Sequence, residues 1–332
     1  MDNSPPRAAV LAIDAGNSKT DVALVSSDGR LLGRARGGAF HPHRIGVEAA
    51  VAELAPLVDK ARIEAGLPAD GGPVAEHVCA CLANADLPLE CEALHDAIAA
   101  WSWSTTVEVF NDTFGLLRAG LDEPRGVAVV CGAGINCAGM LPDGRTARFA
   151  AVGHISGDWG GGGNLWQEAM WWAARAEDGR GPDTRLRQAL PDHFALDSMA
   201  ALIEAVHFAT LSEQQCLELT PVLFQVAETG DQVAEGLVRR QAEEVTGLAV
   251  AAMRKLGLTD EPVDVVLGGG VLTAGHAQLL DEVHRLLAEA APHATPRVVR
   301  TPPVVGAALL GLDLLGAPPA AATRLRAAFD AG

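Results

Sequence analysis

The stretch that decides the fold runs from Ala8 to Arg36 and reads AAVLAIDAGNSKTDVALVSSDGRLLGRAR. Three runs in it have the length and composition of single strands: Ala8–Ile13, Thr20–Ser26 and Arg30–Arg36. The first run ends in a glycine turn that begins at Asp14, and Asp28-Gly29 separates the second run from the third. Because Asp-Gly between two such runs is a strong signal for a tight hairpin, we expect three adjacent strands here.

The same pattern starts again about 118 residues later. An apolar run, Gly126–Val130, enters the glycine turn Cys131–Asn136, and two further runs flank Asp143-Gly144. A duplicated supersecondary unit is typical of a protein built from two similar halves. A chain of 332 residues also exceeds the size at which one hydrophobic core usually stops growing. The sequence therefore predicts two lobes.

Helical and strand-like patterns alternate along the rest of the chain. Helices are expected at 45–65, 89–100, 111–120, 163–177, 197–208, 212–228, 231–257, between 270 and about 290, and at 304–315. Further strands are expected at 77–83, 105–110, 263–267 and 298–300. This alternation predicts an α/β class.

Composition excludes several classes of partner. The formal net charge is −17 and no basic block occurs, which argues against a nucleic acid or an anionic membrane as partner. No apolar run reaches the roughly 18 residues that span a bilayer, and the polar start lacks the features of a signal peptide, so we expect a cytoplasmic protein. The six cysteines (79, 81, 91, 131, 137 and 216) form no Cys-x-x-Cys pair and are expected to be reduced thiols.

Three glycine turns follow predicted strands, at Asp14–Thr20, Gly132–Asn136 and Gly268–Gly270. Such a turn suits phosphate binding because backbone N–H groups can approach the anion where no side chain intervenes. Neither the P-loop pattern nor the dinucleotide-binding glycine pattern of the Rossmann fold is present. The residues alone therefore favour phosphate binding of another kind.

Two aspartates follow predicted strands, and each has two readings. Asp14 either hydrogen-bonds its own turn or holds Mg²⁺ through water beside a nucleotide. Asp112 either caps the helix that follows it or is a base at the carboxyl end of a strand, where α/β sheets bind ligands. The local sequence leaves both pairs of alternatives open.

These motifs, in this order, resemble those of the actin–hexokinase superfamily of ATPases. Asp14–Asp21 looks like its first phosphate motif, Cys131–Asn136 like the second and Leu267–Val271 like its adenosine motif. Within the superfamily the chain most resembles the group of the N-acetylglucosamine kinases and the BadF/BadG-type ATPases, with matching segments at Asn111–Thr113, Gly153–Asp158 and Val305–Ala308. The resemblance covers essentially the whole chain. It implies a two-lobed, actin-like ATPase fold with duplicated ribonuclease H-like domains.

The resemblance implies an ATP-dependent kinase for an amino sugar, most closely N-acetylglucosamine, with Mg²⁺ and ATP bound between the lobes. Asp112 would be the general base that takes the proton from the attacking sugar hydroxyl, and Asp14 would serve Mg²⁺ through water. The residues implied for the nucleotide are Gly16, Asn17, Ser18, Lys19, Thr20, Gly132, Ala133, Gly134, Gly269 and Gly270. Those implied for the sugar are His41, Asn111, Asp112, Gly153, His154 and Asp158.

The resemblance also implies an N-terminal lobe of residues 1–117, to which a helix at 304–316 returns, and a C-terminal lobe of residues 118–303. It implies a homodimer. Four positions depart from the kinase pattern: Ala133 stands where a threonine is usual, His41 where an asparagine touches the sugar, Val152 where an aromatic residue precedes Gly-His, and Trp159 where an acid follows Asp158. The nucleotide motifs are therefore better matched than the sugar pocket.

Other functions remain open on the sequence. BadF-type ATPases that drive electron transfer into a dehydratase or reductase hold an iron–sulfur cluster through cysteines, but Cys131 and Cys137 show no cluster-like spacing. ROK-type sugar kinases bind structural zinc, and no cysteine cluster follows His154. A non-catalytic sugar sensor would not need both Asp14 and Asp112. Glucosamine or another sugar is an alternative substrate.

Overall fold

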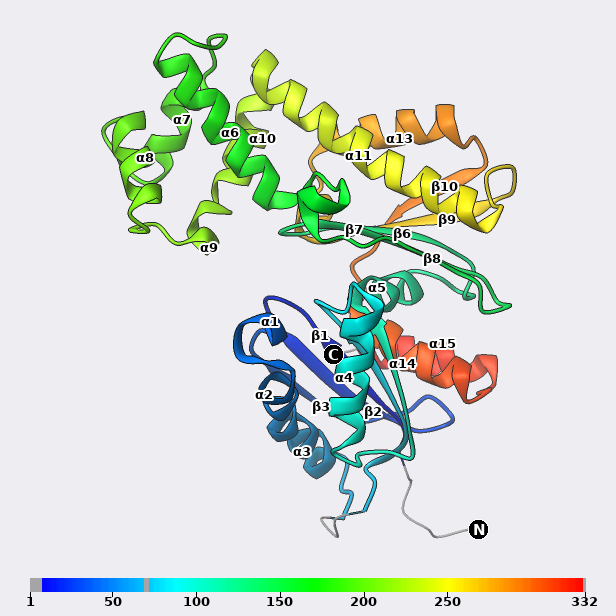
Figure 1. The fold of residues 1–332 in the computed structure, drawn as a ribbon. Coiled ribbons are helices and arrows are strands. Elements are labelled where there is room, and N and C mark those ends of the chain that lie inside the picture. The colour runs from blue at the N-terminus through cyan, green and yellow to red at the C-terminus, as the bar shows by residue number, and fades with distance from the viewer. Residues whose placement is uncertain (1–7, 69–71, 331–332) are drawn as a thin grey trace. The chain divides into compact units, whose positions relative to one another are not determined.

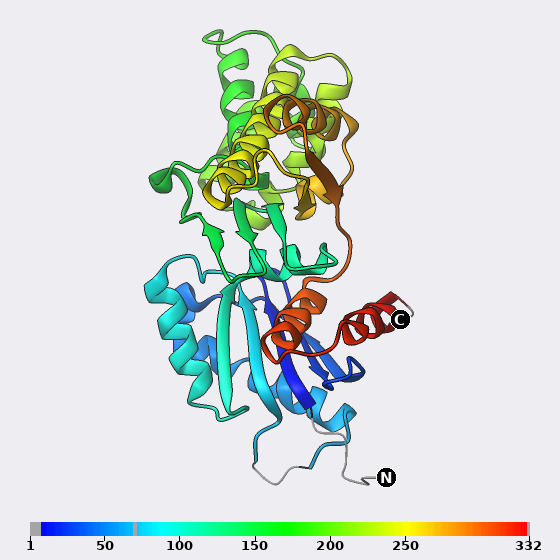
Figure 2. The same cartoon turned by 90° about the vertical axis from the view of Figure 1, so that its right-hand side faces the viewer.

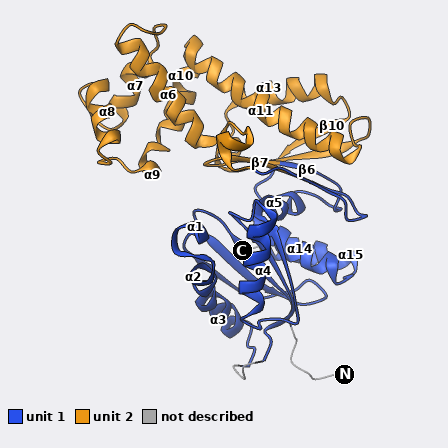
Figure 3. Ribbon diagram, viewed as in Figure 1, with its two compact units in different colours: residues 1–128, 138–150, 299–332 blue, residues 129–137, 151–298 orange. Residues whose placement is uncertain are grey.

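The computed structural model describes residues 8–68 and 72–330. The chain divides into two compact units (Figure 1, Figure 3). Unit 1 consists of Met1–Ala128, Ala138–Ala150 and Val299–Gly332, and unit 2 of Val129–Cys137 and Ala151–Val298. No helix in the described ranges is both long and apolar enough to cross a membrane.

The first sheet lies in unit 1 and has the strand order β3-β2-β1-β4-β5. Its strands are β1 (Ala8–Ala15), β2 (Thr20–Val25), β3 (Leu31–Gly37), β4 (Ala75–Leu82) and β5 (Thr106–Asn111). β1, β2 and β3 form the predicted antiparallel hairpins, whereas β4 is parallel to β1 and β5 is parallel to β4. The parallel strands β1, β4 and β5 therefore end at the same edge of the sheet.

Helices cover both faces of this sheet. Its helices are α1 (Pro42–Ile45), α2 (Val47–Ala52), α3 (Ala55–Glu64), α4 (Pro88–Ala99), α5 (Asp112–Ala119), α14 (Pro303–Leu314) and α15 (Pro319–Asp330). Leu11 and Ile13 belong to a core cluster with Val58 of α3, whereas Val10, one residue out of phase, contacts Gly311 of α14. Because side chains alternate along a strand, α3 and α14 lie on opposite faces.

Two contacts fix the positions of α14 and α15, which are orange and red in Figure 2. A methyl group on Gly306 of α14 would lie 1.7 Å from the carbonyl oxygen of Gly115 in α5, so the glycine lets these helices touch. Arg326 of α15 donates to the carbonyl oxygens of Ala119, Arg118 and Leu121 at the end of α5. The side chain thereby satisfies carbonyl groups that have no partner inside α5.

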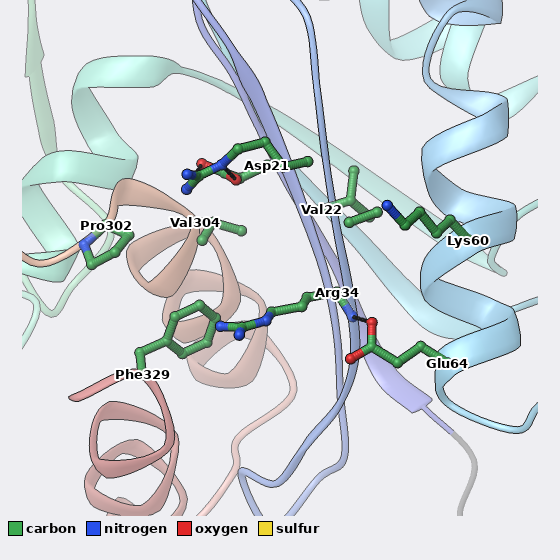
Figure 4. A pocket seen from close by; sticks show the side chains of 10 residues that line it. Asp21, Val22, Arg34, Lys60, Glu64, Pro302, Val304 and Phe329 are labelled. Carbon is green, nitrogen blue, oxygen red and sulfur yellow. Dashed lines mark hydrogen bonds and ion pairs between the residues drawn. The ribbon is translucent and has the colours of Figure 1, made fainter. Parts of the chain in front are cut away.

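β3 is an edge strand of the first sheet. The backbone N–H of Arg34 donates to Oε2 of Glu64, which lies at the end of α3, at 3.0 Å. Figure 4 shows this bond beside a cavity of about 540 Å³. Its lining residues are Asp21, Val22, Arg34, Ala35, Arg36, Lys60, Glu64, Pro302, Val304 and Phe329.

The second sheet has the order β10-β9-β6-β7-β8. Its strands are β6 (Gly126–Cys131), β7 (Ile135–Met140), β8 (Thr146–Arg148), β9 (Val263–Gly268) and β10 (Ala294–Val298). Read from β8, this order repeats that of the first sheet from β3, with an antiparallel β7–β8 pair and a parallel β9–β10 pair. The predicted α/β fold with two equivalent sheets is confirmed.

Helices make up most of unit 2. They are the 3₁₀ turn η1 (Gly153–Ser156), α6 (Gly161–Glu177), α7 (Leu186–His193), α8 (Met199–His207), α9 (Glu213–Cys216), α10 (Leu219–Glu228), α11 (Gln232–Leu256), α12 (Gly270–Thr273) and α13 (Ala277–Ala290). α11 has both ends capped. Asp231 accepts from Val233 N and Ala234 N, and Gly257 closes the helix in the left-handed conformation.

Several predicted elements differ from the observed ones, and proline explains most of the differences. The helix predicted at 45–65 is broken before Pro56, and the one at 212–228 is broken before Pro221. A proline ring clashes with the carbonyl group four residues earlier, so each chain segment starts a new helix there. The strand predicted at 298–300 lies instead at Ala294–Val298, where an edge strand accommodates Pro296. α7 and α15 were not predicted.

Candidate active site

The acidic end of β1 is the first part of the candidate site. Asp14 is buried, with 7% of its surface exposed, and lies opposite Asp21 in the register of β1 and β2. Arg36 donates to both carboxylate oxygens of Asp21, at 2.6 and 3.1 Å, and Lys19 Nζ lies 3.5 Å from Asp21 Oδ2. Arg36 and Lys19 therefore offset the negative charge of Asp21 beside the predicted first phosphate turn.

Burial, followed by the charges of Asp112 and Asp21, raises the pKa of Asp14 to about 8, while Lys19 and Arg36 lower it. The carboxyl group of Asp14 is thus held where a negative charge is costly. A bound cation would favour the ionised form of this group.

Asp112 is the first residue of α5, directly after β5, and its side chain is half-buried. The cap of α5 is Asn111, whose Oδ1 accepts from Thr113 N at 3.0 Å, so the alternative in which Asp112 caps the helix is wrong. Burial raises the pKa of Asp112 to about 6, although the neighbouring polar groups of Thr113 lower it. The structure therefore leaves Asp112 with a raised pKa at the carboxyl end of a sheet.

The sequence analysis missed Asp86, which follows β4. Asn111 Nδ2 donates to Asp86 Oδ1 at 2.8 Å, and burial, together with the charges of Asp112 and Glu90, raises the pKa of Asp86 to about 7. Glu90 accepts from the backbone N–H of Asp86 and contacts His43 Nε2 at 2.9 Å. Asp14 lies at the end of β1, Asp86 follows β4 and Asp112 follows β5, and these three strands are parallel neighbours. The position of Asp86 after a strand is the signal by which the sequence could have identified it.

Asn84 joins the first phosphate turn to the loop that contains His41. Its φ is 62°, and its Nδ2 donates to Asn17 Oδ1 at 3.1 Å. Phe40 N donates to Gly16 O at 3.0 Å, so the segments at 16–17 and 40–41 are in contact. A left-handed asparagine is uncommon and often marks a functional turn. His41 itself precedes α1 without capping it.

Unit 2 contains the predicted second phosphate turn and the predicted adenosine motif. Ala133 and Gly134 are exposed, and Gly132 is half-buried. Gly269 has a φ of 84°, and a methyl group on it would lie 2.4 Å from the carbonyl oxygen of Cys131. The predicted adenosine motif therefore packs directly on the strand that leads into the second phosphate turn. Gly270, the first residue of α12, faces open space.

The predicted sugar segment forms the turn η1 and the residues after it. Gly153 and His154 are exposed, and Asp158 N donates to Gly153 O at 3.1 Å. Ser156 Oγ donates to Asp158 Oδ2. Trp159 is buried beneath Arg240, whose guanidinium carbon lies 3.9 Å from the centre of the indole. Trp159 therefore fills a packing position in unit 2.

The cavity beside Asp21 does not include Asp14 or Asp112 among its lining residues, so it is separate from these two aspartates (Figure 4). In the described ranges, no three His, Cys, Asp or Glu side chains are grouped so that they could hold a metal ion.

Known structures define the fold class. A protein of Chromobacterium violaceum, proposed in its structure report to be an N-acetylglucosamine kinase, matches with a TM-score of 0.70 and 24% identity, over 93% of this chain and 100% of that one. A ROK hexokinase of Thermus thermophilus matches with a TM-score of 0.56 and 20% identity, over 90% and 96%. The chain therefore has the two-lobed α/β fold of the actin-like sugar kinases.

Residues 11–311 match the model of the BadF/BadG/BcrA/BcrD ATPase family, and the chain belongs to that family. It is 27% identical over 280 residues to an N-acetylmuramic acid/N-acetylglucosamine kinase of Clostridium acetobutylicum, covering 84% of this chain and 90% of that protein. It is also 27% identical over 318 residues to an N-acetyl-D-glucosamine kinase of Dictyostelium discoideum, covering 91% and 97%.

Proposed function

We propose that this protein is a kinase that transfers the terminal phosphoryl group of ATP to a hydroxyl group of an N-acetylated amino sugar. The observation that carries the proposal is the carboxyl group of Asp112. It lies at the end of β5, is not used as a helix cap, and has a pKa of about 6. A general base needs a pKa close to the working pH, and Asp112 meets this requirement.

In the proposed reaction, Asp112 accepts the proton of the sugar hydroxyl as its oxygen attacks the terminal phosphorus of ATP. The bond between that phosphorus and the bridging oxygen breaks, and ADP leaves. Such transfers depend mainly on positioning and charge neutralisation. Asn111 would help to hold the sugar because Asp86 and Thr113 N fix its side-chain amide.

The residues present fit ATP. Gly16–Thr20 and Gly132–Gly134 form turns after strands, and Gly269 has no room for a side chain. Lys19 and the backbone of these turns would hold the phosphates. Gly153, His154 and Asp158 remain the candidates for contacts with sugar hydroxyls, together with His41.

Mg²⁺ would neutralise phosphate charge, and Asp14 is the residue we propose to hold it through water. Mg²⁺ in such sites usually keeps several waters and takes one or two carboxylates. The carboxyl of Asp14, with Asp21 paired to Arg36, fits this role.

The alternative, an ATPase that activates an electron-transfer enzyme, is less well supported. Burial raises the pKa of Cys131 to about 12, and it also raises the pKa of Cys137. Cluster ligands are thiolates, and neither thiol is suited to that form. The names of the two relatives also favour the sugar kinase.

The first test is ADP release from ATP and Mg²⁺ with a panel of N-acetylglucosamine, N-acetylmuramic acid, glucosamine and glucose. We expect stimulation by at least one N-acetylated sugar and a loss of about 10²–10⁴-fold in Asp112→Asn. Steady ATP hydrolysis that no sugar stimulates would favour the activator. Full activity of Asp112→Asn would show that Asp112 is not the base.

A further inference from the structure

The carbonyl groups of the second phosphate turn are held by the first turn of α6. Gly162 N donates to Gly132 O and Gly163 N donates to Ala133 O, both at 2.8 Å. The carbonyl oxygen of Gly134 accepts from Gly132 N at 2.9 Å, within the turn. The carbonyl oxygens of Gly132, Ala133 and Gly134 therefore all accept hydrogen bonds, which fix the conformation of the turn.

These hydrogen bonds determine the direction of the N–H groups of Ala133 and Gly134. In a trans peptide the C=O and the following N–H point in opposite directions. Because α6 holds the oxygens of Gly132 and Ala133, the N–H groups of Ala133 and Gly134 point away from α6. Within residues 8–68 and 72–330 neither N–H has a hydrogen-bond partner, and both residues are exposed. Two adjacent free N–H groups can bind an anion.

Two residues set the position of the first turn of α6. Gly161 has a φ of 84°, and a methyl group on it would lie 2.4 Å from Gly134 O. Gln241 of α11 is completely buried, and its Oε1 accepts from Gly161 N at 2.9 Å. The glycine at 161 leaves room for α6 to approach the turn this closely, and the acceptor at 241 satisfies Gly161 N.

The NH₂ group of the Gln241 side-chain amide indicates a role beyond stability. Its Nε2 is buried and has no hydrogen-bond partner. Leaving a buried donor unpaired is unfavourable, so packing alone does not account for an amide at this position. The acceptor oxygen is the part of Gln241 that the site uses.

We propose that Gln241 and Gly161 are positioning residues for nucleotide binding. They hold α6 against the second phosphate turn, so that the N–H groups of Ala133 and Gly134 face the phosphates of the nucleotide. The inference rests on the proposed use of ATP.

The test compares Gly161→Ala with Gly230→Ala, measuring the affinity for ADP by calorimetry and the melting temperature. Gly230 has a φ of 80° and nothing within 4 Å of its added methyl group, so both substitutions bring similar backbone strain. We expect Gly161→Ala to weaken ADP binding about tenfold or more, and Gly230→Ala to change it by less than about twofold.

Gln241→Met provides a readout that a purely structural residue would not give. We expect ADP affinity to fall severalfold while the melting temperature changes little, because the substitution removes the unpaired Nε2 but leaves Gly161 N without its acceptor. Unchanged ADP affinity in Gln241→Met, or equal losses in Gly161→Ala and Gly230→Ala, would overturn the inference. Absence of ADP binding by the unmodified protein would instead overturn the proposed function, and this inference with it.

Discussion

At the scale of single residues, the pKa of Asp112 has a direct kinetic consequence. A base acts only when ionised, and burial places the pKa of Asp112 at about 6. At saturating Mg²⁺ and ATP, where a bound cation would keep Asp14 ionised, we expect kcat/KM for the sugar to be level above about pH 7 and to fall about tenfold per unit below pH 6. A pH–rate profile from pH 4.5 to 8.5 measures this, and a profile that stays level to pH 4.5 would contradict it.

The same carboxyl group lowers stability at neutral pH. Its folded pKa, about 6, lies above the ordinary value of 3.8, so ionisation is less favourable in the folded chain than in the unfolded one. Asp112→Asn should raise the free energy of unfolding by up to about 3 kcal/mol near pH 7.5. The gain should shrink as the pH falls through 6 and vanish below about 4.

Thermal unfolding at pH 4 and pH 7.5 tests this expectation. The exposed Asp197 is a suitable control, and Asp197→Asn should leave the melting temperature nearly unchanged. Equal stability of Asp112→Asn and the unmodified protein at pH 7.5 would show that the Asp112 site does not penalise the charge.

The sequence predicts the candidate site residues that belong to motifs and misses those defined by contacts. Asp14 and Asp112 could be predicted because each follows a strand. Gln241 lies in the middle of α11, and only the packing of that helix brings it to Gly161. Asp86 lies in the loop between β4 and α4 and belongs to no motif. Its hydrogen bond from Asn111 Nδ2 is what places it in the candidate site.

At the scale of elements, α15 stabilises α5, which begins with Asp112. Arg326→Ala would leave the carbonyl oxygen of Ala119 without this donor, whereas that of Leu121 would keep its bond from Arg118 Nη1. We expect a loss of about 1.5–3 kcal/mol in unfolding free energy, since hydrogen bonds from charged groups are strong. Chemical denaturation measures the loss.

Arg324→Ala is the matched control because it removes an arginine from the same helix. Arg324 is exposed and pairs with the exposed Asp28, so its loss should cost less than about 1 kcal/mol. Similar losses in both variants would contradict the capping role of Arg326.

Most elements could be predicted from periodicity, and the exceptions have local causes. β1 and β2 were predictable because their runs are apolar and lead into the glycine turn and Asp28-Gly29. α15 was not predicted because only Ala321 and Leu325 of it are buried. A helix held mainly by arginine contacts to distant carbonyl groups has a weak hydrophobic pattern.

At the scale of the whole molecule, the two sheets share one strand order, as the repeated sequence pattern predicted. The units themselves are interleaved along the chain, and unit 1 takes segments from three separate ranges. The sequence pattern indicates neighbouring strands well, because hairpins are local. It indicates less about the return of the chain after residue 298, since those contacts are distant in sequence.

The thiols provide a test that samples both units. Five of the six cysteines are buried, and Cys91 is half-buried with Arg148 donating to its sulfur at 3.2 Å. A thiol reagent should modify about one group quickly in the native protein and six after unfolding. Cys91→Ser is the control and should abolish the fast reaction. Rapid modification of several thiols in the native protein would show that the buried ones are accessible.

The bond between Glu64 and the backbone of Arg34 bears on how copies of this chain behave in concentrated solution. A sheet edge with free N–H groups can pair with a strand of another molecule and start aggregation. Glu64 occupies the N–H of Arg34 and places a carboxylate in the path of an incoming strand. This side chain therefore disfavours the addition of a strand from another copy of the chain at this edge, a role that concerns neither catalysis nor the stability of a single molecule.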